Sequence, residues 1–394
     1  MARNRRRKEE QAVFVPRQPE ERADLVIFVD RDTRESKYKY HLICDHPNLA
    51  RAYGPCLSPK NLNDYIEILG NRIERVNQIY SKYDQFQKNG SLSPQSISEL
   101  QRDLEIIGIE LYRNLFDDEF KALYWDILKD NVKSVLIHSE DLRIPWELVR
   151  PSKDEAEDLF WGEKFELARY PKNLRMPRTI HVRKIVLISP PLSQDSSEVF
   201  HRSSAQEEFD LIRQAFSNVD FEEVNPPNKQ AIEQLFQQSN SFSNLHYFGH
   251  CRFVQLDPDA SCLILANGET LMAREVVGRL LGFASNGNQA FIFMNACASA
   301  GDNFNFSGVN GWIRVFVYDA KCSGFIGTCW EVSHFAACKF SAFFYNSVTN
   351  SSGLMTVARA LKDARLDLRD LYPGDPSWLS YTIYGEPFAK FVLQ

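Results

Sequence analysis

Two apolar runs in this sequence end in side chains that could do chemistry together. NLHYFGHC, residues 244–251, ends in His250 and Cys251, and QAFIFMNAC, residues 289–297, ends in Cys297. An imidazole can take or stabilise the proton of a thiol, and the resulting thiolate attacks carbonyl carbons. Taken singly, such a histidine or cysteine is more often a structural core residue. Together, at two matching strand ends, His250 and Cys297 indicate a nucleophile and its base.

A metal site is the second explanation for the two histidines of this stretch. His246 and His250 share one face of a strand, but lie about 13 Å apart at ~3.3 Å per residue. The sequence also contains no HExxH motif, no CxxC pair and no GxxxxGK loop. We therefore expect neither a metal nor an organic cofactor.

The second half of the chain alternates between strand and helix patterns. Buried strands are expected at 184–192, 244–251, 289–297 and 320–330, and helices at 204–216, 229–239, 269–281, 334–348 and 356–369. This alternation is typical of a mostly parallel sheet flanked by helices on both faces. In such sheets, ligands bind beyond the carboxyl ends of the strands, where His250 and Cys297 would meet.

The first half of the chain has a different pattern. Residues 1–24 are expected to form a disordered basic tail, followed by strands at 23–29 and 37–44. Apolar residues at steps of three and four predict helices at 61–83 and 97–115, within a helical hairpin of about 59–129. Ser93 and Pro94 provide a cap and a first-turn proline for the second helix. The hairpin is either scaffold or a surface for a partner.

Bulk composition excludes several classes of protein. The chain has 394 residues, 44% of them hydrophobic, and a net charge of −6, so we expect no direct nucleic-acid binding. It has no apolar run of 18 residues, so no membrane span is expected. Its basic first residues are not followed by an apolar stretch, so no secretory leader is expected either. Its eight cysteines form no CxxC pair and mostly lie in apolar runs, which favours the reducing cytoplasm.

An ordered set of motifs resembles the CHAT domain, a family of caspase-like and separase-like cysteine peptidases. The motifs are IPWELVRP, KIVLISPP, HYFGHCRF, DPDASCLILANGETLMAREV, FIFMNACASAG, GFIGTCWEVSHFAACKFSAFFYNSV, ARALKDAR and SYTIYGEP. The resemblance covers roughly residues 25–394. It implies a caspase–haemoglobinase fold, with a degenerate, pseudo-caspase-like N-terminal lobe (25–180) packed on a catalytic C-terminal lobe (181–394).

The resemblance also implies roles for individual residues. His250 matches the catalytic histidine and Cys297 the nucleophile, and the backbone N–H groups of Cys251 and Cys297 would form the oxyanion hole. The residues Trp330, Glu331, Ser333 and His334 would line the substrate channel.

Two positions depart from the family pattern. Cys251 stands where glycine is usual, so its Cβ should crowd the site, and a positive φ would be strained. It is expected to be a bystander or a redox partner of the site. His334 stands where aspartate is common, which puts a preference for basic P1 residues in doubt, although Glu331 could supply a charge.

These features predict a cytoplasmic cysteine endopeptidase that cleaves a protein substrate and is activated by a separate partner, in a setting such as bacterial antiviral defence. The alternative is an inactive pseudopeptidase that acts as a protein-binding module. A third reading is a zymogen, inert until a partner orders loop 298–311.

Overall fold

The computed structural model describes most of the chain beyond its first 21 residues. The described residues are 22–32, 37–44, 68–73, 75–79, 93–139, 141–142, 144–170, 174–190, 196–238, 242–252, 254, 257–277, 289–298, 310–351 and 353–394. Residues 1–21 of the predicted basic tail and most of loop 298–311 lie outside these ranges.

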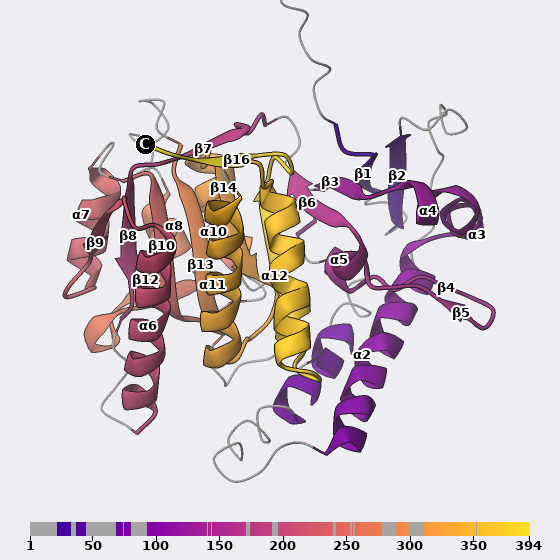
Figure 1. Ribbon diagram of the computed structural model, residues 1–394, viewed down its shortest axis with the longest axis horizontal. Coiled ribbons are helices and arrows are strands. Elements are labelled where there is room, and N and C mark those ends of the chain that lie inside the picture. The colour runs from indigo at the N-terminus through magenta and orange to yellow at the C-terminus, as the bar shows by residue number, and fades with distance from the viewer. Residues whose placement is uncertain are drawn as a thin grey trace, which may run out of the picture.

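A mostly parallel sheet forms the centre of the second half. Its strands run in the spatial order β9-β8-β10-β13-β14-β15 (Figure 1). They span Asp220–Glu223, Lys184–Ile188, Asn244–Arg252, Phe291–Ala298, Gly324–Thr328 and Tyr381–Gly385. All neighbouring pairs are parallel except β14 and β15. The short antiparallel strands β11 (Cys262–Ile264) and β12 (Thr270–Met272) extend from the carboxyl end of β10.

The same sheet continues into the first half of the chain. Next to β15 come β6 (Glu166–Tyr170), β3 (Ser134–Ser139), β1 (Leu25–Asp32) and β2 (Lys37–Cys44), giving a 12-stranded sheet in all. The connection between the halves is narrow, since β15 and β6 share one register pair, Tyr384 with Arg169. The proposed lobe boundary at residue 180 remains a prediction.

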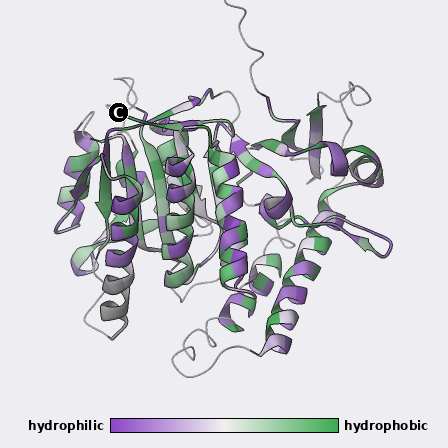
Figure 2. Ribbon diagram, in the orientation of Figure 1, coloured by the Kyte–Doolittle hydropathy of each residue, from purple (hydrophilic) through white to green (hydrophobic). Residues whose placement is uncertain are grey.

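Helices cover both faces of the sheet in the second half. Helices α6 (Ser196–Ala215), α11 (His334–Asn350) and α12 (Val357–Leu371) lie side by side on one face (Figure 1). Helices α7 (Lys229–Gln237), α8 (Ala273–Val276) and α10 (Asn310–Ile313) contribute to a second apolar core on the other face. The strands between these layers are largely hydrophobic, whereas α12 carries hydrophilic residues on its outer side (Figure 2). This arrangement explains why β10 and β13 read as continuous apolar runs.

Helix α2 (Pro94–Leu115) forms as its sequence pattern predicts. The Ser93 side chain accepts a hydrogen bond from Ser96 N, Pro94 occupies the first turn, and Leu100, Leu104 and Ile107 are buried. Of the preceding predicted helix, the described residues 68–73 and 75–79 are helical.

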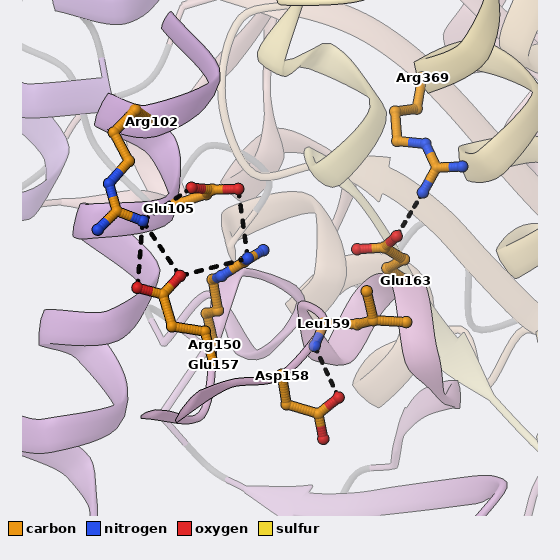
Figure 3. A network of polar contacts seen from close by, with 8 residues as sticks. All are labelled: Arg102, Glu105, Arg150, Glu157, Asp158, Leu159, Glu163 and Arg369. Atoms are coloured by element: carbon orange, nitrogen blue, oxygen red, sulfur yellow. Dashed lines mark hydrogen bonds and ion pairs between the residues drawn. The ribbon is translucent and has the colours of Figure 1, made fainter. Parts of the chain in front are cut away.

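Arginine–carboxylate pairs attach α2 to the hairpin of β4 (Ser152–Lys153) and β5 (Ala156–Glu157). Arg102 and Arg150 each contact both Glu105 and Glu157, and Arg369 of α12 contacts Glu163 nearby (Figure 3).

The remaining elements are short. They are α3 (Asp118–Leu123), the π-helical turn Tyr124–Leu128, α4 (Lys129–Asn131), the 3₁₀ turns Trp146–Leu148, Pro258–Ala260, Ala266–Gly268 and Pro376–Leu379, α5 (Trp161–Lys164), the π-helical turn Arg314–Asp319, and the paired strands β7 (Thr179–Val182) and β16 (Lys390–Leu393). Among the described residues, no helix is long and apolar enough to cross a membrane.

One predicted element is wrong in type. The sequence pattern predicted a single helix over 269–281, but residues Thr270–Met272 form β12, and of the residues described in this range Ala273–Val276 form helix α8. The strand forms because Leu271 pairs with Leu263 of β11, a non-local contact that a local periodicity cannot report.

Candidate active site

The carboxyl ends of β10 and β13 bring His250 and Cys297 together. These adjacent parallel strands pair residue by residue, and His250 is the register partner of Cys297. Neighbouring strands lie about 4.8 Å apart, so the two backbone positions are within the reach of a side-chain pair. The two-residue period of a strand assigns positions 293, 295 and 297 to one face, as it does 246, 248 and 250.

The backbone around His250 is held by Tyr247. The Tyr247 hydroxyl shares its one proton between the carbonyls of His250, at 2.9 Å, and Ile264, at 3.1 Å. The Tyr247 ring folds against Gly249, where an added Cβ would lie 2.7 Å from the hydroxyl oxygen. Glycine at this position therefore allows a contact that fixes the strand end carrying His250.

The imidazole of His250 packs against a second imidazole. Its ring lies 5.6 Å from the ring of His334, centroid to centroid, at an interplanar angle of 77°. Burial lowers the pKa of His250. Burial, together with the nearby His250, lowers the pKa of His334 to about 4. At neutral pH, His334 is thus an uncharged neighbour of His250, whereas an aspartate here would be an anion.

Cys251 points away from this pair into the apolar core. Its side chain is fully buried in the layer that contains Leu263 and Trp312, and burial raises the pKa of its thiol well above the usual value. A buried, protonated thiol is a poor nucleophile. The backbone of Cys251 does not have the positive φ that would be strained, because the described non-glycine residues with positive φ are Asp154, Asn267 and Lys321. The strand β10 simply continues in extended form through Arg252.

The four residues predicted to bind substrate occupy different environments. Trp330 is buried, and its backbone N and O are both hydrogen-bonded to the Ser380 hydroxyl, at 3.0 and 2.9 Å. Glu331 is exposed, and its carbonyl accepts from Asn77 at 3.3 Å. Ser333 caps α11 by accepting from Ala336 N at 3.2 Å. Of these four side chains, His334 is the one whose ring packs against His250.

A buried polar cluster lies farther down the same two strands, and the sequence analysis did not identify it. It consists of Glu208 of α6, His246 of β10, Asn295 of β13, Tyr345 of α11 and Tyr381 of β15, all essentially inaccessible to solvent. Glu208 Oε1 lies 2.7 Å from His246 Nε2 and accepts from Asn295 Nδ2 at 2.8 Å. His246 Nδ1 lies 3.1 Å from the Tyr345 hydroxyl. His246 is thus satisfied within the core, which removes it from any metal site with His250.

The sequence signals for this cluster were polar residues at positions where the surrounding pattern is apolar. Asn295 interrupts the run FIFMNAC, and His246 interrupts NLHYFG. Helical spacing also places Glu208 on the apolar face of α6, three residues after Ala205 and four before Ile212, whereas its exposed neighbour Glu207 lies off that face.

Comparison with known proteins gives one family and one fold. The sequence pattern of the CHAT domain matches residues 111–386. A search of curated proteins finds no significant match. Among solved structures, Saccharomyces cerevisiae separase in complex with securin aligns with a TM-score of 0.51 and 13% identity, over 93% of this chain and 30% of that one. A second separase–securin structure from this yeast gives 0.50 and 12%, over 92% and 30%.

More distant is gingipain R (RgpB) of Porphyromonas gingivalis, described as an Arg-specific cysteine proteinase, with a TM-score of 0.42 and 11% identity, over 69% of this chain and 67% of that one. The chain spans less than a third of the length of the separases that it matches. The separase likeness establishes the caspase–haemoglobinase fold.

Proposed function

Because this chain belongs to the CHAT domain family, we propose that it is a cysteine endopeptidase with a Cys297–His250 dyad. The observation that carries the proposal is the register of β10 and β13, which pairs His250 with Cys297 at the carboxyl ends of two central strands. The burial of Cys251 supports the choice of Cys297 as nucleophile.

In the proposed reaction, the Cys297 sulfur attacks the carbonyl carbon of a peptide bond after its proton passes to His250. Backbone N–H groups of Cys251 and Cys297 stabilise the oxyanion. The His250 imidazolium then protonates the leaving amine as the C–N bond breaks, which leaves a thioester on Cys297. Water, deprotonated by His250, hydrolyses the thioester and regenerates the thiol. The lowered pKa of His250 suits this role, since the imidazole is neutral and able to accept a proton at physiological pH.

We further propose that Glu331, Ser333 and His334 border the substrate, supported from below by Trp330. A neutral His334 does not favour a basic P1 side chain, so we expect a preference for uncharged P1 residues unless Glu331 supplies the charge. A separate protein would control access, in a cytoplasmic and defence-related setting. The solved separase structures that contain securin are an analogy for such a partner and nothing more.

The rate of Cys297 alkylation by iodoacetamide tests the dyad directly. At pH 6, an ordinary thiol of pKa about 8.5 reacts slowly, whereas a thiol paired with an imidazole reacts faster. We expect labelling at Cys297 to fall at least about tenfold in His250→Ala, measured by peptide mapping, with no change in Cys251→Ser.

Slow labelling of Cys297 at a rate that is the same in the wild type and in His250→Ala would contradict the dyad. It would favour the alternative function, a pseudopeptidase that binds proteins, for which the replacement of the common aspartate by His334 is the supporting observation.

A further inference from the structure

Asn295 connects the strand of the candidate nucleophile to the helix that flanks the candidate base. Its Nδ2 donates to the carbonyl of Ala337 at 2.9 Å and to Glu208 Oε1 at 2.8 Å, and its Oδ1 accepts from the Tyr381 hydroxyl at 2.8 Å. Asn295 precedes Cys297 by two residues on β13. Ala337 lies in the first turn of α11, three residues after His334, whose ring contacts His250.

These hydrogen bonds leave the Asn295 amide a single orientation. A primary amide has two N–H donors, and both are used here, by two acceptors on different helices. The Tyr381 hydroxyl on β15 donates to the remaining atom of the Asn295 amide, so that atom is the oxygen. One side chain therefore ties β13 to α6, α11 and β15 immediately below the site.

Burying the Glu208 carboxylate is not expected to stabilise the fold. Removing a carboxylate from water carries a large desolvation cost, and well-packed apolar residues commonly replace buried ionic groups without loss of stability. Glu208 nevertheless lies fully buried between two donors, Asn295 Nδ2 and His246 Nε2. His246 precedes His250 by four residues on β10, so the carboxylate joins the two strands that end in the candidate dyad.

We infer that Asn295 is a positioning residue for the Cys297–His250 dyad, and that Glu208 fixes its orientation. This inference rests on the proposed peptidase function. The hydrogen bond to Ala337 holds the strand of Cys297 against the first turn of α11, whose His334 packs on His250. The Glu208 carboxylate, shared with His246, ties β13 to β10, and the two links together set the distance between the thiol and the imidazole. Misplacement of reacting groups by about 1 Å can cost a hundredfold in rate.

Asn295→Asp is the direct test, because it keeps the shape of the side chain but removes both donors and places a carboxylate against Glu208. We measure the second-order rate of iodoacetamide labelling at Cys297 from pH 5.5 to pH 9 in the full chain. The expected result is a loss of about tenfold or more below pH 7, with less than about a twofold change at pH 9, as Cys297 reverts to an ordinary thiol. A change of packing alone would alter the rate at both ends of the pH range.

Two further variants make the test specific. Glu208→Gln combined with Asn295→Asp exchanges donor and acceptor, and is expected to recover part of the rate below pH 7. Glu207→Gln is the matched control, since Glu207 also joins α6 to α11 through Lys339, at 2.6 Å, but on the surface. Should Asn295→Asp not fold, Glu208→Gln alone is measured, and a several-fold loss below pH 7 is expected.

The outcomes separate this inference from the proposed function. A wild-type profile in folded Asn295→Asp or Glu208→Gln, with labelling that still depends on His250, would overturn the positioning role and leave the peptidase proposal intact. Wild-type labelling that does not depend on His250 would overturn both.

Discussion

His334 defines the charge of the candidate site at the scale of single residues. It packs on His250 at a position where the CHAT resemblance suggests an aspartate, and its own pKa is lowered to about 4. An anion at this distance would stabilise the His250 imidazolium, whereas a neutral imidazole does not. The chain therefore keeps His250 in its neutral, proton-accepting form over the physiological range.

Restoring the aspartate tests this argument. In His334→Asp, the carboxylate should raise the pKa of His250 by about one unit or more, because an opposite charge within 4–6 Å favours the protonated form. The pKa is measured from the NMR titration of the His250 ring, and His334→Asn is the uncharged control. The fraction of imidazolium at pH 6 should rise in His334→Asp and stay low in His334→Asn. Equal titration in the two variants would contradict the electrostatic role of this position.

At the scale of elements, the segment between β14 and α11 is held by buried backbone contacts. Ser380 ends the 3₁₀ turn Pro376–Leu379, directly before β15. Its hydroxyl accepts a hydrogen bond from Trp330 N and donates one to Trp330 O. Cys329 N also donates to Ser380 O at 2.8 Å. The segment between β14 and α11, which would border a substrate, is thus held in place by hydrogen bonds to one buried serine.

We expect Ser380→Ala to lower the free energy of unfolding by about 1–3 kcal/mol, because it removes two buried hydrogen bonds to the backbone of Trp330. Urea unfolding followed by tryptophan fluorescence measures the loss. Ser98→Ala on the exposed face of α2 is the control, since the hydroxyl of Ser98 donates only to the carbonyl of Pro94 in its own helix. A Ser380→Ala variant as stable as this control would show that the segment does not depend on the serine.

Among these elements, those that depend on local features could be predicted from the sequence, and those that depend on distant contacts could not. Helix α2 was predictable because its cap, Ser93, and its apolar stripe are local features. The alignment of His250 with Cys297 was predictable because parallel strands place their carboxyl ends together. The strand β12 was not, because it forms by pairing with β11, which a local periodicity does not report. Glu208 was missed because its two partners lie 38 and 87 residues away in the chain.

At the scale of the whole molecule, a buried charge cluster joins the two halves of the sheet. Glu147, in the 3₁₀ turn Trp146–Leu148, pairs with Arg169 of β6, and its other oxygen lies 3.6 Å from Arg365 Nη2 of α12. Arg365 also donates to the carbonyls of Gly162 and Tyr381, at 3.2 and 2.7 Å. All three charged side chains are nearly inaccessible, and burial lowers the pKa of Arg365 to about 10. One carboxylate therefore compensates two buried cations where the sheet connection is narrowest.

Glu147→Gln should consequently cost about 3–5 kcal/mol in the free energy of unfolding, because it leaves two guanidinium groups buried without an anion. Glu157→Gln is the matched control: Glu157 also lies between two arginines, Arg102 and Arg150, but at the surface (Figure 3). Exposed pairs contribute little, so its loss should be less than about a third as large. Urea unfolding followed by fluorescence and circular dichroism measures both variants. If the two variants lose similar amounts of unfolding free energy, the two halves do not depend on the Glu147 cluster. If a large loss is confined to Glu147→Gln, the Glu147 cluster is the contact that makes the two halves fold as one unit.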